Sequence, residues 1–118
     1  MRLKFSTTSE LYRIPAEAVV CFTAEGNYSV LATVDGKEIT LTLQLGQVEK
    51  YLSETLSTDN KFIRIGKSMI VNIDFITCIN PQRQKLILSD YRAFRREMSA
   101  SKEALKALKE FIEKEVTL

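Results

Sequence analysis

The centre of the chain reads Asn60-Lys61-Phe62-Ile63-Arg64-Ile65-Gly66-Lys67-Ser68-Met69-Ile70-Val71-Asn72-Ile73-Asp74-Phe75-Ile76. Two short runs rich in β-branched and aromatic residues, at positions 62–65 and 69–71, flank a Gly-Lys-Ser loop. Apolar runs of this length, bounded by turn residues, predict two β-strands joined by a tight connection. The segment therefore indicates a fold built on short strands.

Two polar side chains inside this segment have an expected place on the strands. Because successive side chains of a strand point to opposite faces, Arg64 should lie opposite Ile63 and Ile65. There it can meet a phosphate or a structural carboxylate such as Asp74, and the sequence leaves both possibilities open. Asn72 stands at a strand end, where asparagine usually secures a turn by bonding the backbone. We therefore interpret Asn72 as structural.

Strand signals continue on both sides of the central segment. Similar runs occupy residues 10–14, 19–25, 28–34 and 37–43 before it, and residues 76–79, 85–88 and 93–98 after it. Glu25-Gly26-Asn27 separates the second run from the third, and Asp35-Gly36 is the common signal of a two-residue hairpin. The sequence predicts about eight to ten short strands in all.

Two stretches have the spacing of an amphipathic helix instead. Leu45, Val48, Leu52 and Leu56 recur at three- and four-residue steps, which places them on one helix face. A second helix is expected over about residues 101–116, with Ser101 as its N-cap. Its apolar face would comprise Leu105, Leu108, Phe111 or Ile112, and Val116.

Composition indicates a single globular domain spanning residues 1–118. Hydrophobic residues make up 45% of the 118 residues and charged residues 27%, and no Gly/Pro/Ser-rich linker divides the chain. The net charge of +2 is small, but basic residues gather in the later part of the sequence. They are Lys61, Arg64, Lys67, Arg83, Lys85, Arg92, Arg95, Arg96 and Lys102. This distribution is compatible with a surface that faces phosphates.

Several classes of protein are disfavoured by what the sequence contains. There is no histidine, and Cys21 and Cys78 each lie in an apolar run, where a thiol is expected to pack as a small hydrophobe. We therefore expect no metal site, no cofactor and no enzymatic activity. No apolar run approaches the roughly 20 residues of a membrane span, and no signal peptide is evident, so a cytoplasmic location is expected.

The central segment closely resembles the signature of LytTR domains, a Phe-x-Arg-x-x-x-Ser-x-x-Val-Asn pattern followed by an Ile. The stretch Phe22-Thr23-Ala24-Glu25-Gly26-Asn27-Tyr28-Ser29-Val30, the Asp35-Gly36 turn and the leucine-led helix match the opening half of the family in order and spacing. Each piece alone is weak. The resemblance becomes specific because it continues from about Ile14 to about Leu108.

The resemblance implies a bacterial DNA-binding domain of the kind that serves as a response-regulator output. The fold would be mainly β, an elongated sandwich of antiparallel sheets with one short internal helix and a C-terminal helix. Loops at one edge would read double-stranded DNA, and a second copy could occupy a paired half-site. No small-molecule substrate and no membrane partner are inferred.

The DNA-facing positions of the family fall in three places of this sequence, with Arg64 as a further candidate. They are the Asn27-Tyr28-Ser29 turn, the Gly66-Lys67-Ser68 loop, and the junction Ser101-Lys102 before the last helix. Lys67 and Ser68 offer a cation and a hydroxyl to a phosphate or a guanine edge. The family usually opens its last helix with Ser-Arg, and lysine cannot reproduce the bidentate grip of arginine, so Lys102 is better suited to a backbone contact.

Each of these places also has a purely structural interpretation. The first can be a plain hairpin turn, the second a solvated lysine loop, and Ser101 a simple N-cap. At the level of the whole chain, the alternative is a protein-interaction or dimerisation module whose DNA face has weakened. The modest charge and the missing arginine keep that alternative open.

Overall fold

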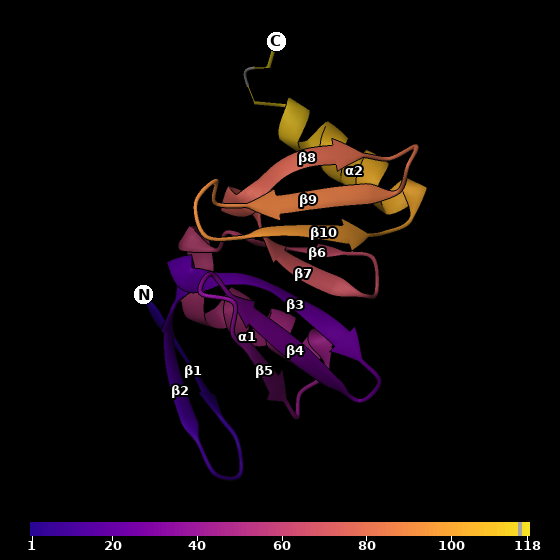
Figure 1. The fold of residues 1–118 in the computed structure, drawn as a ribbon. Coiled ribbons are helices and arrows are strands. Elements are labelled where there is room, and N and C mark those ends of the chain that lie inside the picture. Colours follow the sequence, from indigo (N-terminus) through magenta and orange to yellow (C-terminus); the bar gives the residue numbers. More distant parts are fainter. Residues whose placement is uncertain (116) are drawn as a thin grey trace.

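A computed structural model describes residues 1–115 and 117–118, which form ten β-strands and two α-helices (Figure 1). In chain order these are β1 (Arg2–Ser6), β2 (Leu11–Pro15), β3 (Val19–Glu25), β4 (Tyr28–Thr33), β5 (Glu38–Leu41), α1 (Leu45–Leu56), β6 (Phe62–Ile65), β7 (Met69–Asn72), β8 (Ile76–Asn80), β9 (Lys85–Ser89), β10 (Arg95–Ser99) and α2 (Lys102–Glu113). The expected fold class, mainly β with one internal and one C-terminal helix, is confirmed.

The strands form three antiparallel sheets. The central one has five strands in the order β5-β4-β3-β7-β6, so that the signature segment supplies two of them, β6 and β7. A three-stranded sheet has the order β10-β9-β8, and β1 pairs with β2 in a separate hairpin. The molecule is elongated, with extents of 46 × 28 × 28 Å, and the layers succeed one another along its long axis (Figure 1).

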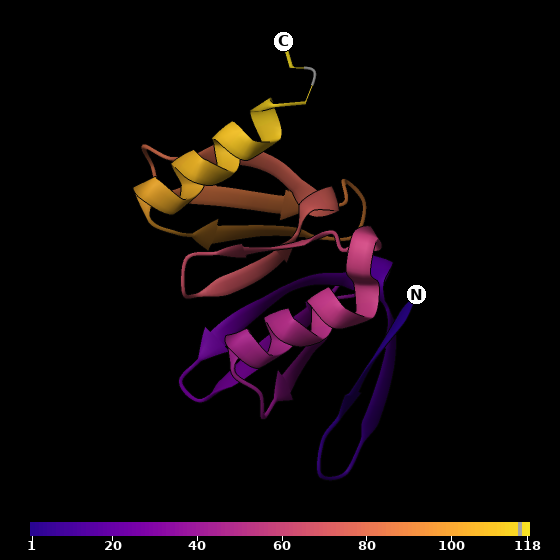
Figure 2. The same cartoon turned by 180° about the vertical axis from the view of Figure 1, so that it is seen from behind.

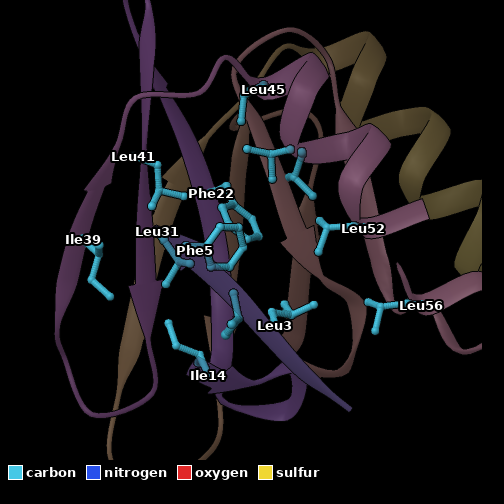
Figure 3. Close-up of a cluster of buried hydrophobic side chains, with 13 residues drawn as sticks. Leu3, Phe5, Ile14, Phe22, Leu31, Ile39, Leu41, Leu45, Leu52 and Leu56 are labelled. Carbon is cyan, nitrogen blue, oxygen red and sulfur yellow. The ribbon is translucent and has the colours of Figure 1, made fainter. Parts of the chain in front are cut away.

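One hydrophobic core lies between the five-stranded sheet, helix α1 and the β1–β2 hairpin. Phe22 and Leu31 point from the sheet toward Phe5 of the hairpin (Figure 3). Helix α1 closes this core with Leu45, Val48, Leu52 and Leu56, the four residues predicted to form its apolar face. The Phe5 ring meets that of Phe22 edge to face at 5.8 Å.

The opposite face of the five-stranded sheet makes a second core. Strand alternation turns Cys21 and Val71 to this side, where they meet Leu86 and Leu88 of β9. Helix α2 covers the core with Leu105 and Leu108, both buried. Ile112 is partly buried while Phe111 is 52% exposed, so Ile112 is the residue that continues the apolar face.

Three sequence-based boundaries need correction. Strand β1 was not expected, although Leu3 and Phe5 alternate with basic residues and both are buried. The Asp35-Gly36 connection is longer than a two-residue hairpin, since Thr33 N–H donates to Lys37 O at 3.0 Å. Helix α2 ends at Glu113 rather than near 116, and the expected apolar Val116 lies outside the described residues.

The two cysteines differ in their surroundings. Cys21 is buried in the second core, and burial raises the pKa of its thiol to about 11. Cys78 is exposed on β8, beside an irregularity in the pairing of β8 with β9. The expectation that both thiols pack in the interior is therefore wrong for Cys78, because the bulge shifts the alternation of the strand. In the described part of the chain, neither helix has the length and apolar character needed to cross a bilayer.

Candidate nucleic-acid interface

Antiparallel pairing sorts the connections between elements onto two opposite edges of the molecule. We call one the Lys67 edge: the β3–β4 turn (26–27), the β5–α1 connection (42–44), the β6–β7 turn (66–68), the β8–β9 turn (81–84) and the β10–α2 junction (100–101). These lie toward the right in Figure 1 and the left in Figure 2. The Asp90 edge carries the other side: residues 16–18, 34–37, 57–61, 73–75 and 90–94.

The β6–β7 turn lies in the middle of the Lys67 edge. Gly66 has a φ of +57°, a left-handed conformation that glycine adopts at little cost. Lys67 and Ser68 are both exposed. Ser68 O accepts the N–H of Ala24 at 2.8 Å, and a Cβ at Gly66 would lie 4.0 Å from that of Ala104. The turn therefore touches both the end of β3 and the first turn of α2, which brings the three predicted places together.

The β3–β4 turn presents only part of its predicted contact set. Asn27 is exposed and Tyr28 is 47% exposed, but Ser29 is 0% exposed. Strand alternation explains the difference, because Ser29 follows Tyr28 in β4 and points, like Leu31, to the side of the first core. Ser29 Oγ is buried without a hydrogen-bond partner among the described residues. Ser29 is therefore corrected from a surface residue to a buried one, and we leave it out of the interface.

Both α-helices direct their N-termini at this edge. Ser101 caps α2, its Oγ accepting the N–H of Ala104 at 3.1 Å, and Lys102 beside it is exposed. At the start of α1, Gln44 and Gln47 bond each other's backbone in a capping box, and the first turn carries no acidic residue. Each helix N-terminus contributes a partial positive charge, so the two together favour an anion along this edge.

Arg64 is held by the protein itself. Its guanidinium donates to Glu49 Oε1 of α1 at 3.0 Å and to Gly66 O at 3.1 Å. The carboxylate partner is thus Glu49 and not Asp74, since Arg64 shares the sheet face that α1 covers. Through these two bonds Arg64 stabilises the conformation of the β6–β7 turn.

Asn72 has the structural role expected of it. It is 3% exposed at the end of β7, where its Nδ2 donates to Val19 O at 3.0 Å. Its Oδ1 accepts the N–H of Asp74 at 3.0 Å. These two bonds tie β3, β7 and the following turn together at the Asp90 edge.

The two edges differ sharply in charge. Across these five connections the Lys67 edge carries two cations, Lys67 and Arg83, and no acid, although the exposed Glu25 and Glu103 stand beside two of them. The five connections of the Asp90 edge carry the acids Glu17, Asp35, Asp59, Asp74 and Asp90 against the cations Lys37, Lys61 and Arg92. The connections of the first edge therefore present less negative charge than those of the second.

Sequence reasoning missed the β8–β9 turn as part of this edge. Gln82, Arg83 and Gln84 are exposed there, and Gln84 O accepts the N–H of Ala100 at 3.3 Å, beside the start of α2. The sequence does distinguish turns with acidic residues from turns without them. This difference points to an edge only once the topology shows which turns lie together. Among the described residues, no group of three or more metal-binding side chains gathers anywhere.

Comparison with known proteins gives a family and a fold. The model of the family described as the LytTr DNA-binding domain matches residues 9–113. A solved structure, the LytTr DNA-binding domain of a protein described as a methyl-accepting/DNA response regulator from Bacillus cereus, is similar with a TM-score of 0.65. It is 20% identical, over 95% of this chain and 96% of that one, an identity at which the likeness shows the fold alone. No curated protein matches the chain.

Proposed function

The chain belongs to the LytTR family of DNA-binding domains, and on that premise we propose that it is a bacterial transcription regulator recognising specific duplex sequences through its Lys67 edge. One observation carries the proposal: the β3–β4 turn, the β6–β7 turn and the start of α2 adjoin one another on an edge whose connections contain no acid. In this proposal residues 1–118 act as one domain, without enzymatic activity of their own.

The exposed side chains supply both kinds of contact that DNA recognition needs. Lys67 can bind the O6 and N7 acceptors of guanine, and Asn27 can pair with the N6 and N7 atoms of adenine. Ser68, Ser101 and Lys102 suit phosphate oxygens, which fix register without reading sequence. Tyr28 offers an apolar ring with a polar tip beside them.

The dimensions of the molecule match a contact with two grooves. The Lys67 edge runs along the long axis of the molecule (Figure 1), whose extent is 46 Å. Successive major grooves on one face of B-DNA are about 34 Å apart. The molecule is therefore long enough to span neighbouring grooves of one duplex. A second copy on an adjacent half-site would extend the same arrangement.

The proposal is tested by selecting binding sites from a random duplex pool and footprinting one of them. We expect an enriched motif, and on that motif Lys67→Ala should reduce discrimination against a scrambled duplex by about 1–3 kcal/mol. Equal weakening on both duplexes would make Lys67 a phosphate contact. A pool that yields no motif at low salt would overturn sequence-specific binding and favour the interaction-module alternative.

A further inference from the structure

A hollow lined by lysines lies at one end of the Lys67 edge. It has a volume of about 360 Å³ and opens between the β8–β9 turn and the outer face of α2. Pro81 and Gln82 form one wall, and Lys102, Lys106 and Lys109 form the other together with Glu110 and Glu113. None of these residues belongs to the three predicted DNA-facing places except Lys102.

The charge of the hollow is graded along α2. Lys109 pairs with Glu113, Nζ to Oε2 at 2.6 Å, and the exposed Glu110 adds a negative charge, so the far end offers no free cation. Lys102 and Lys106 stand one helical turn apart on the near end, and both are exposed. Among the described residues neither side chain takes part in an ion pair, and neither does Arg83 at the tip of the β8–β9 turn.

Two lysines four residues apart on a helix, such as Lys102 and Lys106, repel each other, and an anion bound between them relieves that repulsion. Here the near end of the hollow is open to the Lys67 edge, where the proposed duplex would lie. Gln82, across the hollow from the lysines, adds a hydrogen-bond donor. The arrangement suits a phosphate group approached from the edge.

Resting on the proposed function, we infer that this hollow binds the phosphate backbone of DNA beyond the recognised motif, on the α2 side. Lys102 and Lys106 would neutralise phosphates within the hollow, and Arg83 would contact the same strand at its rim. Because the hollow lies at the α2 end of the molecule, the flank that it contacts is the one on that side of the motif.

The test uses the full chain and duplexes with one copy of the selected motif, trimmed in turn on each flank. The variant Arg83→Ala/Lys106→Ala is compared with wild type and with Lys50→Ala/Arg92→Ala, which removes the same charge from other exposed positions. Affinity is measured by fluorescence anisotropy at 50 and 200 mM salt, and thermal unfolding by circular dichroism checks that every variant folds.

Loss of two phosphate contacts lowers the slope of log affinity against log salt by about 1.8, so the double variant should lose about tenfold less affinity than wild type across this salt range. Wild type should weaken when one particular flank is trimmed, and the double variant, which keeps Lys102, should respond less to that trimming. The control should behave as wild type does.

The inference is overturned if the double variant keeps the wild-type salt slope, or if trimming either flank affects both proteins equally. Failure of the proposed function would look different, because wild type itself would then show no preference for the motif over a scrambled duplex. If wild type prefers the motif but the double variant keeps the wild-type salt slope, the inference about the hollow is rejected and the proposed function stands.

Discussion

The Lys67 edge and the Asp90 edge are opposite ends of the same strands, yet their side chains are used differently. At the Asp90 edge, Asp90 Oδ1 accepts the N–H groups of Arg92, Ala93 and Phe94 at 2.9, 2.8 and 3.2 Å. At the Lys67 edge, no hydrogen bond or ion pair between described residues involves the side chains of Asn27, Lys67, Arg83 or Lys102. Asn27, Lys67, Arg83 and Lys102 are thus free of such bonds at the Lys67 edge, where Ser101 and Gln44 still stabilise the starts of the two helices.

Left-handed backbone positions occur on both edges. Gly26 and Gly66 give the Lys67 edge two left-handed positions, with φ of +64° and +57°. Glycine adopts this conformation without help from a side chain. On the Asp90 edge, Tyr91 has a φ of +61° and is flanked by Asp90, whose carboxylate bonds organise the loop. Gly36 on the Asp90 edge, with a φ of +87°, and Gln84 on the Lys67 edge, with a φ of +56°, show that glycine and other residues serve in this conformation at both edges.

The largest effect is expected at Asn72, the buried side chain of the Asp90 edge. Asn72→Ala removes two hydrogen bonds and leaves Val19 O without its buried donor, which should destabilise the fold by about 1–3 kcal/mol. Chemical denaturation measures this loss. DNA affinity, measured where the variant is still folded, should be unchanged; a large loss of affinity would break the division between a structural and a binding edge.

A smaller effect, dependent on pH, is expected from the carboxylates of the same edge. The N–H groups of Arg92, Phe94 and Ala93 hold the pKa of Asp90 below its usual range, and the Thr33 hydroxyl and Lys37 N–H do so for Asp35. A depressed folded-state pKa gives stability that is present above the unfolded-state value, about 3.9, and is lost as pH falls through the folded-state value.

Asp90→Asn should therefore lower the melting temperature at pH 7 and flatten its decline under acid conditions. Thermal unfolding between neutral pH and about pH 2 shows this directly. Wild-type and variant curves that remain parallel throughout would mean that the Asp90 charge does not stabilise its loop.

The smallest effect is expected at Ser29, the buried side chain near the Lys67 edge. Its hydroxyl is unpaired in the described structure, so Ser29→Ala should change stability by less than about 1 kcal/mol, toward greater stability. Affinity for DNA should not change. A variant that folds normally but binds DNA poorly would return Ser29 to the interface and show that the β3–β4 turn rearranges on binding.

Most of the fold was predictable because local signals and burial agree. Strands β3 and β6 have the bounds that their composition predicted, and the leucine spacing of α1 matches its buried face. Strand β1 was missed because five residues beside a polar turn, with Leu3 and Phe5 alternating with Arg2 and Lys4, give a weak signal until β2 pairs with them.

The sequence predicted the three places of the candidate interface more completely than it predicted which of their residues are exposed. Lys67 and Lys102 are exposed as required, but the burial of Ser29 depends on which face of β4 meets a core, and sequence leaves that phase open. The sequence left the partner of Arg64 open between a phosphate and a carboxylate such as Asp74, and Glu49 was not foreseen because it comes from α1, fifteen residues away. Pairings across elements depend on packing that local patterns do not encode.

The central claim, that DNA meets the Lys67 edge, is tested most directly by two matched double variants on one selected duplex. Lys67→Ala/Lys102→Ala alters that edge, and Lys37→Ala/Lys61→Ala removes the same charge from the Asp90 edge. We predict that the first lowers the slope of log affinity against log salt by up to about 1.8 and that the second leaves it at the wild-type value. Equal slopes for the two variants, or a larger change in the second, would contradict the account.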